Sequence, residues 1–156
     1  LYLARVWWMP NGEVLVGIQD RAQRRLDLVA FDPKSGVRRV LRRETSNYWI
    51  NLHNMFHALE AGPGELAGGF VWATEEDGFM HLVVVASDGR QLLRLTSGPW
   101  IVDSIAAVDE AGGMVYFTGT KDGDTQRNLY AVPLLGGEIK RLTPDDGMHS
   151  VTVHAE

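Results

Sequence analysis

Cysteine is absent from the 156 residues of this chain. Disulfides, thiolate metal sites and a cysteine nucleophile are therefore excluded. No apolar run approaches the roughly 20 residues of a membrane span, and no signal-peptide pattern is visible. The net charge of −5 is modest and no block of like charge stands out. We therefore expect neither nucleic acid nor a membrane as a partner, and the compartment stays open between cytoplasm and periplasm.

The nucleophile motif of most serine hydrolases, Gly-x-Ser-x-Gly, is also missing. None of the six serines lies between two glycines at that spacing, and no alternation of strands and helices is present to hold such a turn. The sequence predicts no catalytic residue within this chain.

Metal-binding patterns are weak. His53 and His57 have the spacing of two ligands on a helix, but Asn54 replaces the glutamate that a zinc peptidase needs after the first histidine. The acidic loop that starts at Asp122 has Arg127 where a calcium loop requires glycine. We interpret the first segment as a polar loop and the second as a hairpin turn, and we predict neither a metal nor another cofactor.

What the chain does have is a short apolar strand that returns three times. Leu28, Leu82 and Leu129 each lie in such a run, and the runs are 54 and 47 residues apart. A glycine turn and a further short strand follow each run, and the second and third copies end in Arg-Leu-Thr. The offset from the leucine to that threonine, Thr96 or Thr143, is 14 residues in both copies. A period of about 40 to 50 residues with several short strands is typical of a β-propeller blade.

We therefore predict an all-β fold of about three four-stranded antiparallel blades, a fragment of a larger ring. The blades are expected at residues 1–43, 44–98 and 99–148, with residues 149–156 starting a next blade through a strand at 151–153. The chain begins without methionine and enters a strand at once, so we expect it to belong to a longer protein. Propellers have at least about four blades, so either further blades or self-association through open blade edges is expected.

Three local features have simple structural interpretations. A helical turn is expected at residues 52–59, inside an aromatic and polar segment. The basic runs at 21–25 and 38–43 are interpreted as solvated strand edges rather than a phosphate track. Glu75 and Glu76 are expected to be turn residues that face water, although such a pair could hold an ammonium group.

The order of motifs resembles a known family. The motifs are WINLH at 49–53, FVWATEEDGFMHL at 70–82, LTSGPW at 95–100, VYFTGTKD at 115–122 and NLY at 128–130. Together they are similar to the propeller of the dipeptidyl peptidase IV family, in the prolyl oligopeptidase clan, and they look closest to its cytosolic eight/nine branch and bacterial relatives.

The resemblance implies an N-terminal eight-bladed propeller and a C-terminal α/β-hydrolase domain that carries the serine, aspartate and histidine of the triad. The full enzyme would release N-terminal dipeptides with proline or alanine at the second position, and its partner would be a peptide substrate. The family grips the substrate's free amine with two glutamates on a helical insert of an earlier blade. Glu75 and Glu76 align with an ordinary hairpin and are not that pair.

The resemblance also implies a substrate loop. In the family, the loop with the Trp-x-Asn-x-His run projects toward the cavity between the two domains. His53 and Asn54 are the positions expected to touch the substrate, with Trp49 and Asn51 in support, although relatives often have aspartate where this chain has Asn54. The alternatives are that this loop only braces the rim, and that the whole chain belongs to a binding or scaffold propeller without a hydrolase.

Overall fold

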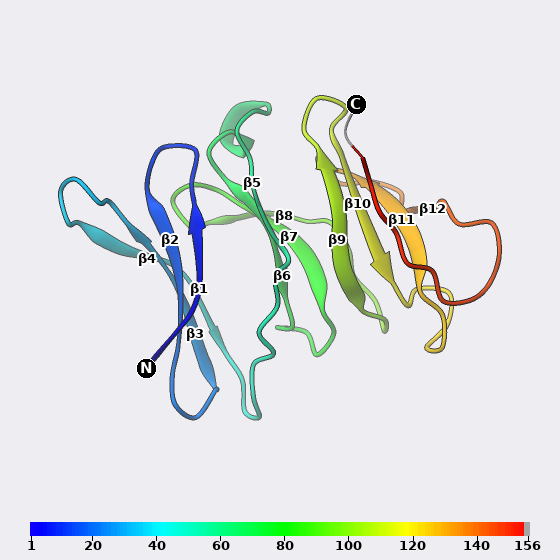
Figure 1. The fold of residues 1–156 in the computed structure, drawn as a ribbon, viewed down its shortest axis with the longest axis horizontal. Coiled ribbons are helices and arrows are strands. Elements are labelled where there is room, and N and C mark those ends of the chain that lie inside the picture. The colour runs from blue at the N-terminus through cyan, green and yellow to red at the C-terminus, as the bar shows by residue number, and fades with distance from the viewer. Residues whose placement is uncertain (155–156) are drawn as a thin grey trace.

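The computed structural model describes residues 1–154 and contains three four-stranded antiparallel sheets, one after another along the chain (Figure 1). The first sheet contains β1 (Tyr2–Trp8), β2 (Val14–Gln19), β3 (Arg25–Phe31) and β4 (Arg38–Thr45). The second contains β5 (Phe56–Ala58), β6 (Phe70–Thr74), β7 (His81–Val85) and β8 (Gln91–Arg94). The third contains β9 (Val102–Asp109), β10 (Met114–Gly119), β11 (Asn128–Pro133) and β12 (Lys140–Arg141).

Each sheet is a meander in which the strands lie in chain order, as in a propeller blade. The only helix among residues 1–154 is the short 3-10 turn η1 (Gly64–Leu66). No helix in this part of the chain is long and apolar enough to cross a membrane. The predicted all-β fold of three antiparallel blades is therefore confirmed.

The middle blade lies between the other two, and its sequence reflects this position. Every residue of β6 and β7 is buried, because both faces of these strands are covered. In the first blade, β2 and β3 instead alternate between buried and partly exposed residues, because only one face packs against a neighbour. The near-continuous apolar runs of β6 and β7 are the sequence signature of this two-sided burial.

Two apolar cores join the blades. Between the first and second blades, the Trp7 ring stacks on Phe56 at 4.8 Å and meets Trp72 edge-on at 5.7 Å. Between the second and third blades, Phe117 stacks on Tyr130 at 5.5 Å within a cluster that includes the fully buried Leu82. Aromatic side chains of this size supply much of the burial that holds such sheets together.

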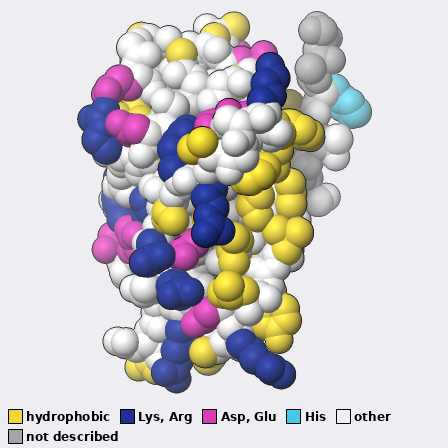
Figure 2. All heavy atoms as spheres, turned by 90° about the vertical axis from the view of Figure 1, so that its left-hand side faces the viewer, with side chains coloured by type: hydrophobic (Ala, Val, Ile, Leu, Met, Phe, Trp, Pro, Cys, Tyr) yellow, Lys and Arg dark blue, Asp and Glu magenta, His cyan; other side chains and the backbone are white. Residues whose placement is uncertain are grey.

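The outer face of the first blade is open and apolar. Hydrogen-bonded register places Val6, Val16, Val29 and Val40 side by side in one row across the four strands. Figure 2 shows this side of the molecule, with a continuous hydrophobic surface bordered by lysine or arginine side chains. An exposed apolar face is therefore present at the first blade.

A buried hydroxyl explains the repeated leucine-to-threonine spacing. In the second blade, the N–H of Leu82 donates to Thr96 Oγ1 at 2.9 Å, and the His81 ring is bonded to the same hydroxyl at 3.0 Å. In the third blade, the N–H of Leu129 donates to Thr143 Oγ1 at 3.3 Å, and this hydroxyl donates to the side chain of the preceding residue, Asn128. The threonine thus ties the last strand of the blade to the third.

Two local predictions were wrong. Residues 52–59 contain no helical turn, because residues 56–58 pair with β6 as strand β5. Residues 151–153 form no strand, because no strand of the described chain lies beside them to supply hydrogen bonds. The rest of the expected start of a next blade, residues 155–156, lies outside the described residues.

The interpretation of the basic runs was only partly correct. Arg38, Arg39 and Arg43 are exposed on β4, but the Arg42 side chain is only 8% exposed. It is buried because the second blade and two carboxylates enclose it, which a run of basic residues does not reveal.

Candidate functional site

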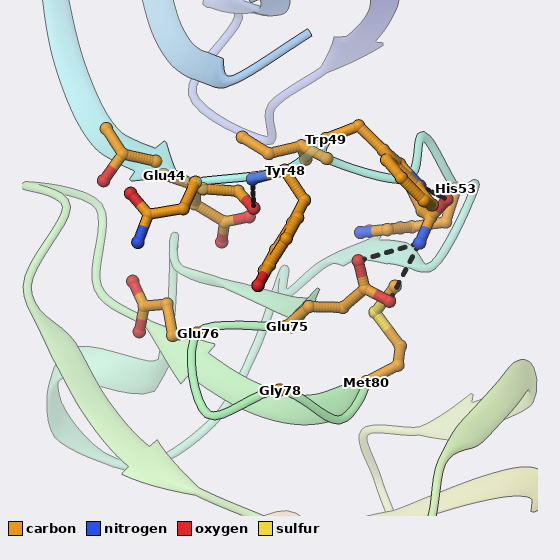
Figure 3. Close-up of a pocket in the computed structure, with 13 residues that line it drawn as sticks. Glu44, Tyr48, Trp49, His53, Glu75, Glu76, Gly78 and Met80 are labelled. Atoms are coloured by element: carbon orange, nitrogen blue, oxygen red, sulfur yellow. Dashed lines mark hydrogen bonds between the residues drawn. The ribbon is translucent and has the colours of Figure 1, made fainter.

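The loop from β4 to β5, residues 46–55, forms one wall of a cavity between the first and second blades (Figure 3). The β6–β7 hairpin, residues 75–80, forms the opposite wall. The cavity has a volume of about 270 Å³. Its lining contains three carboxylates, from Glu44, Glu75 and Glu76, and the aromatic rings of Tyr48 and Trp49.

Glu44 and Arg42 form the buried part of this site. Glu44 is 6% exposed, and its Oε1 accepts hydrogen bonds from Trp72 Nε1 and Arg42 Nε, both at 2.9 Å. The same guanidinium reaches Glu76 Oε1 at 2.8 Å. One arginine is therefore shared by two carboxylates from different blades, so this ion-pair network links the first blade to the second.

Glu75 lies on the other side of the cavity and has no cationic partner within the described chain. Both of its oxygens accept from Asn51 Nδ2, at 3.1 and 3.0 Å, and Asn51 Oδ1 accepts from Trp49 Nε1 at 3.2 Å. Figure 3 shows Glu75 directed toward the loop rather than away from it. The expectation that Glu75 and Glu76 are turn residues facing water was therefore only partly correct: Glu76 is exposed in the turn, but long-range contacts engage both side chains.

His53 is held by both of its ring nitrogens. Because a carbonyl oxygen can only accept, Nε2 donates to the Ala73 carbonyl at 2.9 Å, and Nδ1 then accepts the Met55 N–H at 3.1 Å. The ring also lies 4.4 Å from that of Trp72. Burial lowers the pKa of His53 below its usual 6.5, so the ring is neutral at pH 7. Its contacts position the loop, and no ring nitrogen is left to act on a ligand.

The other expected substrate residues lie at the surface. Asn54 is exposed, and its Oδ1 accepts from Arg5 Nε at 2.7 Å. Trp49 is 63% exposed. The structure therefore brings Trp49, Asn51 and Glu75 together in one chain of hydrogen bonds, whereas Asn54 bonds to the first blade instead.

The end of β2 and the β2–β3 turn are hydrogen-bonded to the loop at residues 46–55. Gln19 Nε2 donates to the Ile50 carbonyl at 3.0 Å, and the Ile50 N–H donates to the Gln23 carbonyl at 2.7 Å. Arg24 Nε donates to the Tyr48 carbonyl at 3.2 Å. These bonds pair backbone groups of an irregular segment, so the loop has a defined shape without regular structure.

The two weak metal patterns have structural explanations. His57 Nε2 contacts Glu110 Oε1 of the third blade at 3.1 Å, while His53 bonds to Ala73, so the two histidines do not share a ligand position. Asp122 Oδ2 accepts from the Tyr130 hydroxyl at 2.8 Å. Within residues 1–154, no group of three or more histidine, cysteine, aspartate or glutamate side chains is arranged to hold a metal ion.

Glu44, Arg42 and Tyr48 were missed by sequence reasoning. The only available signal was the position of Glu44 at the end of an alternating strand, where an acidic residue on the buried face needs a partner. The partner, Arg42, lies two residues away on the same strand, but the burial of both depends on Trp72 of the next blade.

The chain matches, over residues 1–156, the family model described as "Dipeptidyl peptidase IV (DPP IV) N-terminal region". It is 33% identical over 160 residues to probable dipeptidyl-aminopeptidase B of Coccidioides posadasii, which covers 96% of this chain and 17% of that protein. It is 29% identical over 202 residues to human dipeptidyl peptidase 8, covering 97% of this chain and 22% of that protein.

The fold is similar to the crystal structure of Porphyromonas gingivalis dipeptidyl peptidase 4, with a TM-score of 0.77 and 26% identity. The likeness covers 94% of this chain and 20% of that one. This chain therefore spans only 17–22% of the length of these three relatives.

Proposed function

Because the chain belongs to the dipeptidyl peptidase IV N-terminal region family, we propose that it is the propeller part of a serine exopeptidase. The enzyme releases N-terminal dipeptides that have proline or alanine at the second position. The propeller shapes and gates the substrate cavity and excludes folded proteins by size. The catalytic triad belongs to a C-terminal α/β-hydrolase domain, so these 156 residues alone catalyse nothing.

The observation that carries this proposal is the fold likeness to a solved dipeptidyl peptidase over 94% of the chain, at 26% identity. A likeness over this share of the chain reaches all three blades. Fold alone does not define function, but here the matching family model and the curated relatives are dipeptidyl peptidases as well.

Within the loop, Trp49 and Asn54 are the residues proposed to contact a peptide. Both are exposed; Trp49 lines the cavity, and Asn54 follows the lining residue His53 in the same loop. His53 and Asn51 act as positioning residues, because their polar groups are occupied by Ala73, Met55, Trp49 and Glu75.

The first experiment measures activity of the full-length protein that carries this chain on a chromogenic Gly-Pro amide. Release of the chromophore from Gly-Pro amide, and none from its N-acetylated form, is expected of an enzyme that requires a free N-terminus. Absence of any release, in a protein whose remaining sequence has no Gly-x-Ser-x-Gly motif, would support the binding or scaffold propeller instead.

A second experiment tests the loop. Trp49→Ala in the full-length protein should lower kcat/KM for Gly-Pro substrates by about ten-fold, the effect of losing one well-packed aromatic contact. Its melting temperature should change little, since Trp49 is 63% exposed. Leu135→Ala, at a 62% exposed position in the β11–β12 turn, is the matched control and should leave kcat/KM unchanged. Equal kinetics for both variants would limit the loop to bracing the rim.

A further inference from the structure

We propose that the cavity beneath Tyr48 binds the guanidinium group of an arginine side chain presented by a peptide. The cavity is lined by three carboxylates, but Arg42 is the only cation that pairs with any of them among residues 1–154. Arg42 is shared by Glu44 and Glu76, and the one hydrogen-bond partner of the Glu75 carboxylate within the described part of the chain is the neutral amide of Asn51. The site therefore has an excess of negative charge that a cation would neutralise.

Glu44 also offers one carboxylate oxygen to the cavity. It is 94% buried, since only 6% of its surface is exposed, yet both hydrogen bonds that it accepts reach Oε1. No fully buried side-chain nitrogen or oxygen within residues 1–154 lacks a hydrogen-bond partner, so Oε2 is reached from the cavity that Glu44 lines. Because no hydrogen bond from the described residues reaches Oε2, this oxygen can accept one from a donor that enters the cavity.

The shape and the aromatic lining favour a planar organic cation. Tyr48 and Trp49 are 75% and 63% exposed, and Figure 3 shows Tyr48 extending from the loop toward the hairpin that carries Glu75 and Glu76. Guanidinium groups stack on aromatic faces and donate to carboxylates through several N–H groups, whereas an ammonium is a compact and strongly hydrated charge. A volume of about 270 Å³ accommodates one long side chain and not a folded domain.

A peptide N-terminus is a different source of positive charge, and the geometry argues against it. A pair of adjacent glutamates could grip an ammonium from two sides, but Glu76 is bonded to Arg42 at 2.8 Å. The acceptors left for a ligand are Glu44 Oε2 and the remaining lone pairs of the Glu75 carboxylate, which also accepts from Asn51; the two residues come from different blades. Such a separated arrangement suits a forked donor at the end of a side chain.

Calorimetric titration of the full chain with Nα-acetyl-arginine amide tests the proposal directly. Nα-acetyl-citrulline amide is the matched probe, because it has nearly the same shape without the charge. The arginine probe should bind at least about ten-fold more tightly, the effect of one charge-assisted hydrogen bond. Glu75→Gln should remove this preference, and Tyr48→Leu should weaken binding of the arginine probe without unfolding the chain, since Tyr48 is 75% exposed.

Glu138→Gln is the control, because Glu138 is an exposed glutamate of the third blade outside the cavity. It should bind both probes as the unaltered chain does, and thermal melts should show that all variants are folded. Equal binding of the arginine and citrulline probes would overturn the proposal. Equally tight binding of Nα-acetyl-lysine amide would overturn the guanidinium assignment, and tighter binding of glycyl-prolinamide would assign the cavity to an N-terminal amine. Binding is measured without turnover, so failure here leaves the proposed peptidase role standing.

Discussion

Thr96→Val should destabilise the second blade strongly, although it changes only a hydroxyl into a methyl group. Thr96 is 2% exposed, and its Oγ1 accepts the Leu82 N–H at 2.9 Å while it bonds to His81 Nδ1 at 3.0 Å. His81 Nε2 donates to the Gly98 carbonyl at 2.9 Å, so in the neutral ring Nδ1 is the acceptor and the Thr96 hydroxyl is the donor. Valine can neither accept from the first partner nor donate to the second.

The magnitude follows from the two groups that lose their partner. A buried polar group left without a hydrogen bond costs about 1–3 kcal/mol. Both the Leu82 N–H and the His81 ring are buried, so the free energy of unfolding should fall by about 2–4 kcal/mol. For a chain of this length, the corresponding decrease in melting temperature is roughly 4–16 °C.

The matched control is Thr143→Val, which makes the same chemical change at the equivalent position of the third blade. Thr143 is only partly buried, so water can replace the lost hydroxyl, and we expect a loss below about 1 kcal/mol. Urea denaturation followed by circular dichroism would give both values. Equal losses for the two variants, or a loss below about half a kilocalorie for Thr96→Val, would refute the assignment of the buried hydroxyl as the tie between the strands.

Three further predictions use the same assay or light scattering. Leu82→Ala should lower the free energy of unfolding by about 2–5 kcal/mol, because Leu82 is fully buried. Leu129→Ala should lower it clearly less, because Leu129 is only half-buried. Similar losses for the two variants would contradict the assigned core. Burial lowers the pKa of His81 and of His53 below the usual 6.5, so the unfolded chain binds more protons in mild acid. The free energy of unfolding should therefore fall as the pH drops below about 6.5. His81→Gln should make this pH dependence shallower. An unchanged pH dependence in that variant would show that protonation of His81 is not linked to folding. Static light scattering should show self-association of the chain through the open face of the first blade, and Val29→Glu, in the centre of the valine row, should suppress it; a monomer at high concentration before the substitution would refute this.

The sequence predicted the blades because each copy of the repeat contains its own turn. Gly89 shows why such a turn is well determined, since its φ of 95° is a conformation that favours glycine. A β-carbon at this position would also come within 2.0 Å of the Leu41 carbonyl oxygen of the first blade. Local turn geometry and packing between blades thus require the same residue, and a pattern that satisfies both can be recognised without a structure.

The interior of the site could not be predicted in the same way. The family resemblance pointed to the loop at residues 49–54, but not to the chain of bonds from Trp49 through Asn51 to Glu75, which joins segments 24 residues apart. Likewise, a spacing of four residues between His53 and His57 fits a helix, whereas the pairing of β5 with β6 makes residues 56–58 extended. Contacts between segments that are distant in the sequence decided both cases, and no local pattern contains them.

The site nevertheless lies beside the first copy of the repeat, which lacks the threonine of the other two copies. In the second and third copies, the residue 14 positions after the repeated leucine is the threonine that ties two strands of its own blade. In the first copy that position is Arg42, which is paired in register with Leu28. The Arg42 guanidinium bonds to Glu44 on its own strand and to Glu76 of the next blade, and thereby links two carboxylates that line the cavity. The threonines that follow the repeat hydrogen-bond within their own blade. Arg42, which replaces the threonine in the first copy, instead forms an ion pair with the next blade.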